Sequence, residues 1–147
     1  MVKKWFFASL LVVLILDIAT KALVNLYRPA LAVLPFFSLS YVENLGAGFG
    51  IFQGQKLFLI IVSVVALAVI AVYSPKISGK GTQSALGMMA GGILGNLVDR
   101  ILKGYVVDFL DFFVGSYHWP AFNIADSALC IGAVLLVVLS THEKAGK

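Results

Sequence analysis

Four long apolar runs constrain this chain more than any other feature of its sequence. Of its 147 residues, 61% are hydrophobic and only 12% are charged, whereas soluble domains have about a quarter charged residues. Crossing a bilayer takes about 20 mostly apolar residues, which must be helical because the backbone finds no water to bond there. We therefore predict an all-α membrane protein with four transmembrane helices. The expected spans are about 5–26, 57–73, 82–102 and 122–141.

The length, the cysteine content and the net charge limit the possible domain organisation, metal sites and partners. The length suits a single domain, 1–147. Cys130 is the one cysteine in the chain, which excludes an internal disulfide and a multi-cysteine metal site. Its place in an apolar run predicts a buried thiol. The net charge of +4 is better explained by lysines beside the spans than by nucleic-acid binding, so no nucleic-acid partner is expected.

The distribution of basic residues predicts the orientation in the membrane. Six lysines flank the spans on one side, namely Lys3, Lys4, Lys76, Lys80, Lys144 and Lys147. On the other side, Arg28, Lys56 and Lys103 are spread over longer loops. The positive-inside rule then places both termini in the cytoplasm. In the outward loop between the first two spans, residues 36–41 favour a short extracytoplasmic strand.

Polar residues gather near the outer ends of three spans. They are Asp17 and Lys21 in the first span, Asn96, Asp99 and Arg100 in the third, and Asn123, Asp126 and Ser127 in the fourth. Within each span the spacing places them on one helical face. The third span runs outward and the fourth runs inward, so these faces meet in the outer leaflet. Ionisable groups at membrane depth are costly, which makes this convergence a candidate functional site.

The same polar residues leave other functions open. A small ion or proton transporter would also carry intramembrane acids and amides, although the inner halves of the four spans are nearly free of charge. A scaffold that uses polar groups only to hold helices together is a third possibility. Gly87, Gly91 and Gly95 recur every fourth residue, and this bare helix face predicts close approach of a neighbouring helix.

Five short motifs, in order along the chain, carry a resemblance to a known family. They are 17–21 (DIATK), 43–50 (ENLGAGFG), 95–100 (GNLVDR), 104–109 (GYVVDF) and 122–127 (FNIADS). With these motifs on a four-span chain, the protein resembles lipoprotein signal peptidase, the type II signal peptidase of bacteria. One departure is Gly48, which stands where the family motif usually has alanine.

The resemblance implies an intramembrane aspartyl endopeptidase whose dyad is Asp108 and Asp126. Two neighbouring carboxyl groups share one proton and need no metal or other cofactor. The residues alone do not choose this pair, because Asp99 competes with it, although a structural role for Asp99 with Arg100 and Asn96 is equally plausible. Asp111 is expected to be a solvated loop acid. The residues expected to support the site or bind substrate are Asp17, Lys21, Asn44, Gly46, Asn96, Asp99, Arg100 and Asn123.

The resemblance also implies the substrate and the location. The substrate would be a prolipoprotein, cut just before a cysteine that bears a diacylglyceryl group. Cleavage would occur at the outer leaflet of the bacterial cytoplasmic (inner) membrane, with the active site on the extracytoplasmic side. Membrane lipid is the other expected partner, and a monomer is expected.

Overall fold

The computed structural model describes residues 4–47 and 51–145, with the backbone alone at 142–145. Gly48 and the lysines at positions 3 and 147 lie outside the described residues, and the side chain of Lys144 does as well. The described chain contains four helices long and apolar enough to cross a membrane. They are α1 (Lys4–Tyr27), α2 (Lys56–Tyr73), α3 (Lys80–Leu102) and α4 (Ile124–Ala145), and a short 3-10 helix, η2 (Ser74–Lys76), follows α2. These helices coincide with the predicted spans to within a few residues at each end.

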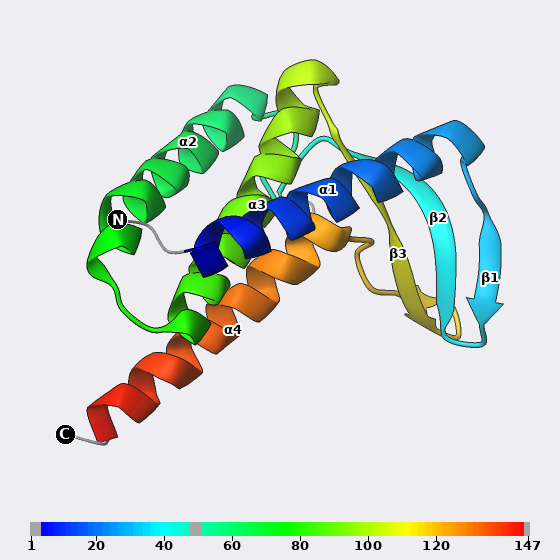
Figure 1. The fold of residues 1–147 in the computed structure, drawn as a ribbon. Helices are drawn as coiled ribbons and strands as arrows, with labels where there is room; N and C mark the ends of the chain where they lie inside the picture. The colour runs from blue at the N-terminus through cyan, green and yellow to red at the C-terminus, as the bar shows by residue number, and fades with distance from the viewer. Residues whose placement is uncertain (1–3, 48–50, 146–147) are drawn as a thin grey trace.

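Helix α3 is the centre of the bundle, with α1, α2 and α4 packed around it (Figure 1). About 56% of its most apolar window is buried, against 11% for α2. Small residues allow this packing, because a Cβ on Gly87 would collide with the carbonyl oxygen of Phe6 in α1. A Cβ on Gly91 would lie 2.8 Å from the Leu10 carbonyl oxygen. The predicted glycine face is therefore confirmed, and its neighbour is α1.

A four-stranded antiparallel sheet adjoins the helices, in the order β1-β2-β3-β4. Its strands are β1 (Leu31–Leu34), β2 (Phe37–Asn44), β3 (Val106–Val114) and β4 (Tyr117–His118). The predicted strand between the first two spans is confirmed as part of β2. The all-α prediction is wrong in that the loop between α3 and α4 also forms strands. The reason is non-local: β3 is stabilised by pairing with β2, from which it is separated by more than 60 residues of chain.

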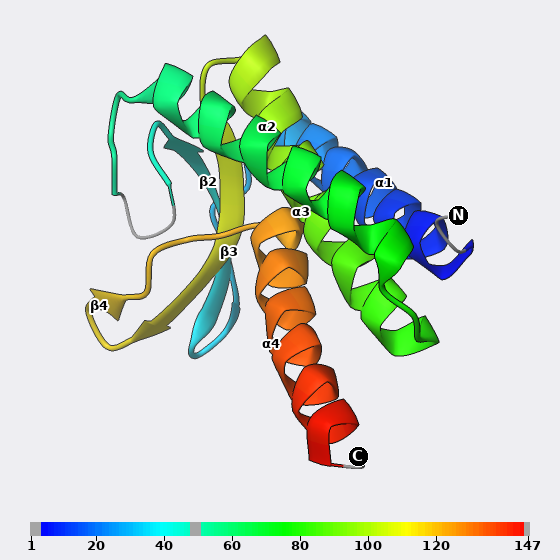
Figure 2. The same cartoon turned by 90° about the vertical axis from the view of Figure 1, so that its left-hand side faces the viewer.

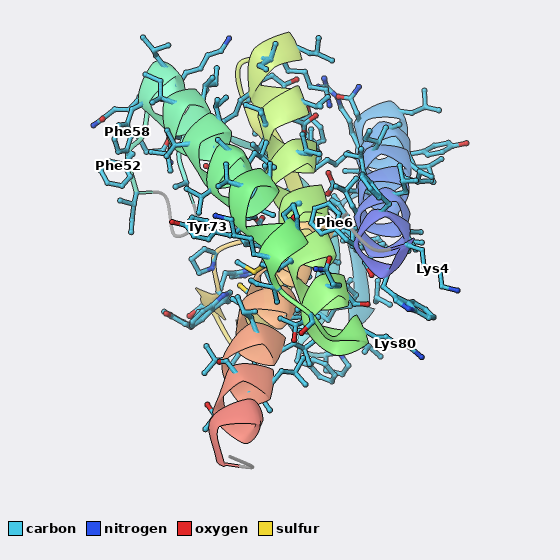
Figure 3. All side chains as sticks on the ribbon, turned by 60° about the vertical axis from the view of Figure 1, so that its left-hand side comes forward. Lys4, Phe6, Phe52, Phe58, Tyr73 and Lys80 are labelled. Atoms are coloured by element: carbon cyan, nitrogen blue, oxygen red, sulfur yellow. The ribbon has the colours of Figure 1, made fainter. Side chains whose placement is uncertain are left out.

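Two apolar clusters join these elements. Phe6, Ile70 and Leu86 are buried together where α1, α2 and α3 meet, and Figure 3 shows Phe6 between α1 and the other two helices. Val24 of α1 packs with Val107 and other residues of β3, which fixes the sheet to the bundle. Both views show the sheet extending back from the end of α1 and passing the start of α4, while the rest of α4 runs away from it (Figures 1 and 2). The start of α4 therefore lies next to β3.

Candidate active site

The N-terminus of α4 holds Asp126 in a fixed position. Asn123 precedes the helix, and its Oδ1 accepts a hydrogen bond of 2.9 Å from the backbone N–H of Asp126. In return, the Asn123 backbone N–H donates to Asp126 Oδ2 at 3.3 Å. This reciprocal arrangement is a capping box, which satisfies donors that a helix start leaves unpaired. The same pair of residues thus begins the helix and orients a carboxyl group.

Asp108 lies on β3 and is almost completely buried, with 1% of its surface exposed. Asn123 Nδ2 donates to its Oδ1 at 2.6 Å, and Asn44 Nδ2 donates to its Oδ2 at 2.8 Å. The pKa of Asp108 is raised to about 7, chiefly by burial and next by the nearby charge of Asp126. The two amide donors oppose this rise, because they stabilise the ionised form. Asp108 therefore keeps its proton close to neutral pH.

Asn96, on α3, connects the dyad to the interior. Its Oδ1 accepts from Lys21 Nζ at 2.9 Å and from Asn123 Nδ2 at 3.1 Å, while its own Nδ2 donates to Asp126 Oδ1 at 2.8 Å. An ammonium group has donors only, so Lys21 requires the oxygen of this amide to face it. The nitrogen then faces Asp126. Lys21 thereby orients an amide that binds one candidate catalytic carboxylate.

The predicted pair of Asp17 and Lys21 is confirmed, with Nζ 2.7 Å from Asp17 Oδ2. Both residues are buried. Asp17 Oδ1 also accepts a 2.9 Å bond from the backbone N–H of Ala125, in the first turn of α4. A negative charge there is favourable, because helix N-termini carry partial positive charge. The pair therefore attaches α1 to the helix that carries Asp126.

Asp99 has its oxygens engaged within the protein. Its Oδ2 lies 3.4 Å from Lys21 Nζ and accepts from the backbone N–H of Val107 at 3.2 Å. Its Oδ1 pairs with Lys103 at 2.8 Å. These contacts favour the structural alternative for Asp99, although its described ion-pair partners are lysines and not Arg100. Asp99 links the end of α3 to the start of β3, two residues before Asp108.

Arg100 reaches the first outer loop. Its Nη2 donates to the carbonyl oxygen of Gly46 at 2.9 Å, and the Gly46 N–H donates to Asn44 Oδ1 at 2.8 Å. A Cβ on Gly46 would lie 2.6 Å from the carbonyl oxygen of Ile51, so the loop has no room for a side chain there. Arg100 and Gly46 thus hold the loop so that the Asn44 amide points at Asp108.

One cavity of about 430 Å³ brings the two candidate catalytic acids together. Asp108 and Asp126 both line it, and Asn44 lines it as well. The other lining residues are Trp119, Pro120, Ala121, Phe122, Ser127, Leu129 and Cys130. Most of this wall is apolar, with the carboxyl groups as its charged members. The remaining predicted site residues do not line the cavity, and several of them hold the dyad in place through hydrogen bonds.

Two expectations outside the dyad need correction. Cys130 is exposed on the cavity wall and is not a buried thiol, because this face of α4 points away from the protein core. Asp111 is not a freely solvated loop acid: it lies on β3, where Ser38 Oγ donates to it at 2.9 Å and His118 Nδ1 contacts it at 2.9 Å. The error on Asp111 follows from reading the segment between α3 and α4 as an irregular loop.

Among the buried polar residues that the sequence analysis did not name, Gln83 is the one with clear side-chain partners. Gln83 is fully buried in α3, and its Nε2 donates to the carbonyl oxygens of Ser74 and Ile77 at 2.6 and 2.7 Å. These bonds hold the turn between α2 and α3 at the end of the bundle away from the dyad. An amide within an otherwise apolar span was the available sequence signal.

Two carboxyl groups on one cavity, at the end of a bundle of membrane-length helices, form the arrangement of a membrane-embedded aspartic peptidase. The family model described as signal peptidase (SPase) II matches residues 9–142, so the chain belongs to the signal peptidase II family. This confirms the family expected from the five motifs.

Individual relatives agree with this assignment. The chain is 44% identical over 143 residues to the lipoprotein signal peptidase of Geobacter sulfurreducens, covering 91% of this chain and 89% of the relative. It is 42% identical over 146 residues to that of Photorhabdus laumondii, covering 90% and 87%. A solved bacterial membrane enzyme, determined by the in meso method, superposes with a TM-score of 0.88 at 31% identity. That match covers 97% of this chain and 90% of the other.

Proposed function

We propose that this chain is an intramembrane aspartic endopeptidase that removes signal peptides from diacylglyceryl-modified prolipoproteins, with Asp108 and Asp126 as its dyad. Its relatives are lipoprotein signal peptidases, which supports the activity and the class of substrate. One observation carries the choice of residues: Asp108 and Asp126 line the same cavity. Asp17 and Asp99, in contrast, are paired with Lys21 inside the bundle.

The reaction follows from one shared proton. The ionised carboxylate removes a proton from a water molecule, and the resulting hydroxide adds to the carbonyl carbon of the scissile bond. The protonated carboxyl group gives its proton to the carbonyl oxygen. When the tetrahedral intermediate collapses, the carbon–nitrogen bond breaks and the leaving amine takes a proton from the dyad. One hydroxyl group of the intermediate returns its proton to the dyad, so the two carboxyl groups again share one proton. The pair titrates as a unit, so neither acid is given a permanent role.

Asparagine side chains prepare the dyad for this reaction. Asn44, Asn123 and Asn96 all donate to its carboxyl oxygens. Amide donors keep their hydrogen-bonding capacity whether or not a carboxyl group is ionised, so they hold the oxygens in place without adding a competing charge. Fixed donors of this kind reduce the reorganisation needed in the transition state.

The location of the reaction follows from the membrane topology. The chain is a multi-pass bacterial membrane enzyme, and we place both termini in the cytoplasm and the cavity at the outer leaflet of the inner membrane. A peptide bond next to a lipid-bearing cysteine would be held near headgroup depth, where this cavity lies. The chain would work as one domain and as a monomer. A reporter fused after Arg28 should give an external signal, and a cytoplasmic signal would contradict this orientation.

The dyad is tested by exchanging each aspartate for asparagine in the full chain. Asp108→Asn and Asp126→Asn should each lower the single-turnover rate on a lipidated precursor by about 1,000-fold or more, because general acid–base catalysis is lost. Asp111→Asn is the matched control on the same strand. It keeps an oxygen for the bond from Ser38 and should retain most of the rate. Near-normal cleavage by both dyad variants would refute the assignment.

A further inference from the structure

Two lysines and a tryptophan from different helices meet at the end of the bundle away from the dyad. Lys4 Nζ lies 5.4 Å from the centre of the Trp5 ring, and Lys80 Nζ lies 5.9 Å from the same ring. Lys4 and Trp5 begin α1, whereas Lys80 begins α3. Figure 3 shows Lys4 and Lys80 extending from these two neighbouring helix ends. We call Lys4, Trp5 and Lys80 the basic cluster.

The basic cluster has no acidic partner among the side chains that the structure describes, a set that does not include Glu143 of α4. The ion pairs found in the described chain involve Lys21, Lys103 and His118, and neither lysine of the cluster. The first turns of α1 and α3 contain no acid either. Two ammonium groups drawn to one ring repel each other unless an anion lies near both. The described chain supplies cations here without the anion that would complete the arrangement.

The position of the cluster indicates where that anion comes from. Lys4 and Lys80 stand at the first residues of two membrane-length helices, hence at the boundary between hydrocarbon and water. Trp5 is 39% exposed, and tryptophan favours this boundary because its ring is apolar and its N–H is a donor. Apolar residues continue directly from the cluster along α1, where Phe6 and Phe7 follow Trp5. A ligand there must therefore combine a negative headgroup with hydrocarbon chains.

We propose that the basic cluster binds the headgroup of an anionic phospholipid. The phosphate oxygens accept from Lys4 and Lys80, the Trp5 indole packs against the glycerol region, and the acyl chains follow the exposed apolar side of α1. The site lies at the opposite end of α3 from the dyad: Lys80 and Asn96, which contacts Asp126, are about 24 Å apart at 1.5 Å per residue. It fixes the depth and tilt of α1 and α3, and it does not depend on the peptidase activity.

The test measures lipid binding to the full chain in a neutral detergent, by native mass spectrometry. Phosphatidylglycerol should bind more tightly than phosphatidylcholine. The double variant Lys4→Gln/Lys80→Gln should weaken phosphatidylglycerol binding by about thirty-fold, since each lysine near a headgroup contributes about five-fold. The double variant Lys4→Arg/Lys80→Arg should retain binding, and peptidase activity in detergent should be unchanged in both.

A matched control removes the same charge elsewhere. Arg28→Gln/Lys56→Gln lowers the net charge equally at the other end of the bundle and should leave lipid binding intact. Equal loss in both double variants would show general charge attraction and overturn the proposal. Equal affinity for phosphatidylcholine would overturn it as well. If inorganic phosphate alone displaced the lipid, the site would be one for a free anion and not for a membrane lipid.

Discussion

The two ends of α3 use charge in opposite ways. At the end near the dyad, Lys21 lies against Asp17, Asp99 and Asn96, so its charge is satisfied inside the protein. At the opposite end, Lys4 and Lys80 share a tryptophan ring and pair with no acidic side chain that the structure describes. The first end is complete in itself, and such a fixed environment suits a site that must hold two carboxyl groups in place. For the opposite end we propose a membrane lipid as the missing partner. Lysines of one helix bundle therefore serve two separate purposes.

The largest expected effect comes from removing the buried lysine. Lys21→Met leaves Asp17 and Asp99 without their shared counter-charge in a buried site, which should lower the free energy of unfolding by about 3–5 kcal/mol. The measurement is reversible unfolding in mixed detergent. Lys80→Met is the matched change at the opposite end of α3 and should leave the unfolding curve in place. Equal destabilisation by the two variants would remove the distinction between the ends of α3.

A smaller loss of activity is expected from removing Asn123, the central member of the three asparagines that bind the dyad, Asn44, Asn96 and Asn123. Asn123→Ala removes the donor to Asp108 Oδ1, the donor to Asn96 and the cap of α4. The peptidase rate should fall about 100-fold, or roughly 3 kcal/mol of transition-state stabilisation. Asn25→Ala, which removes only an exposed bond to Tyr41, serves as the control. A rate within a few-fold of the parent in Asn123→Ala would show that the network does not position the dyad.

The next effect in size is expected from the close packing of α3 against α1. Gly87→Ala places a methyl group against the backbone of Phe6, which cannot move without shifting α1. Overpacking of this kind should cost about 1–3 kcal/mol of unfolding free energy. Gly81→Ala is the matched change in the same helix, where the new methyl group would meet only the flexible Leu139 side chain, at 3.0 Å. Unfolding curves that coincide for the two variants would contradict the close contact of α1 and α3.

The parts of the fold that depend on local pattern were predictable from the sequence. The four spans follow from hydropathy alone, and the pairing of Asp17 with Lys21 follows from their four-residue spacing. The opposite directions of the third and fourth spans correctly predicted that their polar clusters lie at the same end of the bundle, where Asn123 Nδ2 donates to Asn96 Oδ1 at 3.1 Å. These conclusions need only hydropathy, helix geometry and chain direction.

The sheet and the surroundings of Asp108 could not be predicted in this way, because they depend on contacts between segments far apart in the sequence. Strand β3 was read as a loop because its stability comes from pairing with β2, where Val42 lies opposite Asp108. That pairing brings the Asn44 amide to Asp108, a contact that no spacing rule predicts. The choice of Asp108 over Asp99 came from family resemblance, and the structure adds a physical reason: Asp99 is engaged with two lysines.

The shared proton also predicts how the rate depends on pH. Burial raises the pKa of Asp108 from 3.8 to about 7, so its proton is present below that value and lost above it. With both carboxyl groups ionised, no acid remains to protonate the carbonyl oxygen. The peptidase rate should therefore fall as the pH rises above 7.

Titration of Asp108 itself tests the central claim most directly. Infrared difference spectra of the full chain in lipid nanodiscs should show one carboxyl band with a midpoint near pH 7, and Asp108→Asn should remove it. In Asp126→Asn the midpoint should move to lower pH, because the neighbouring charge is gone, yet stay above 3.8, because burial remains. A midpoint that does not change in Asp126→Asn would contradict a dyad that shares one proton.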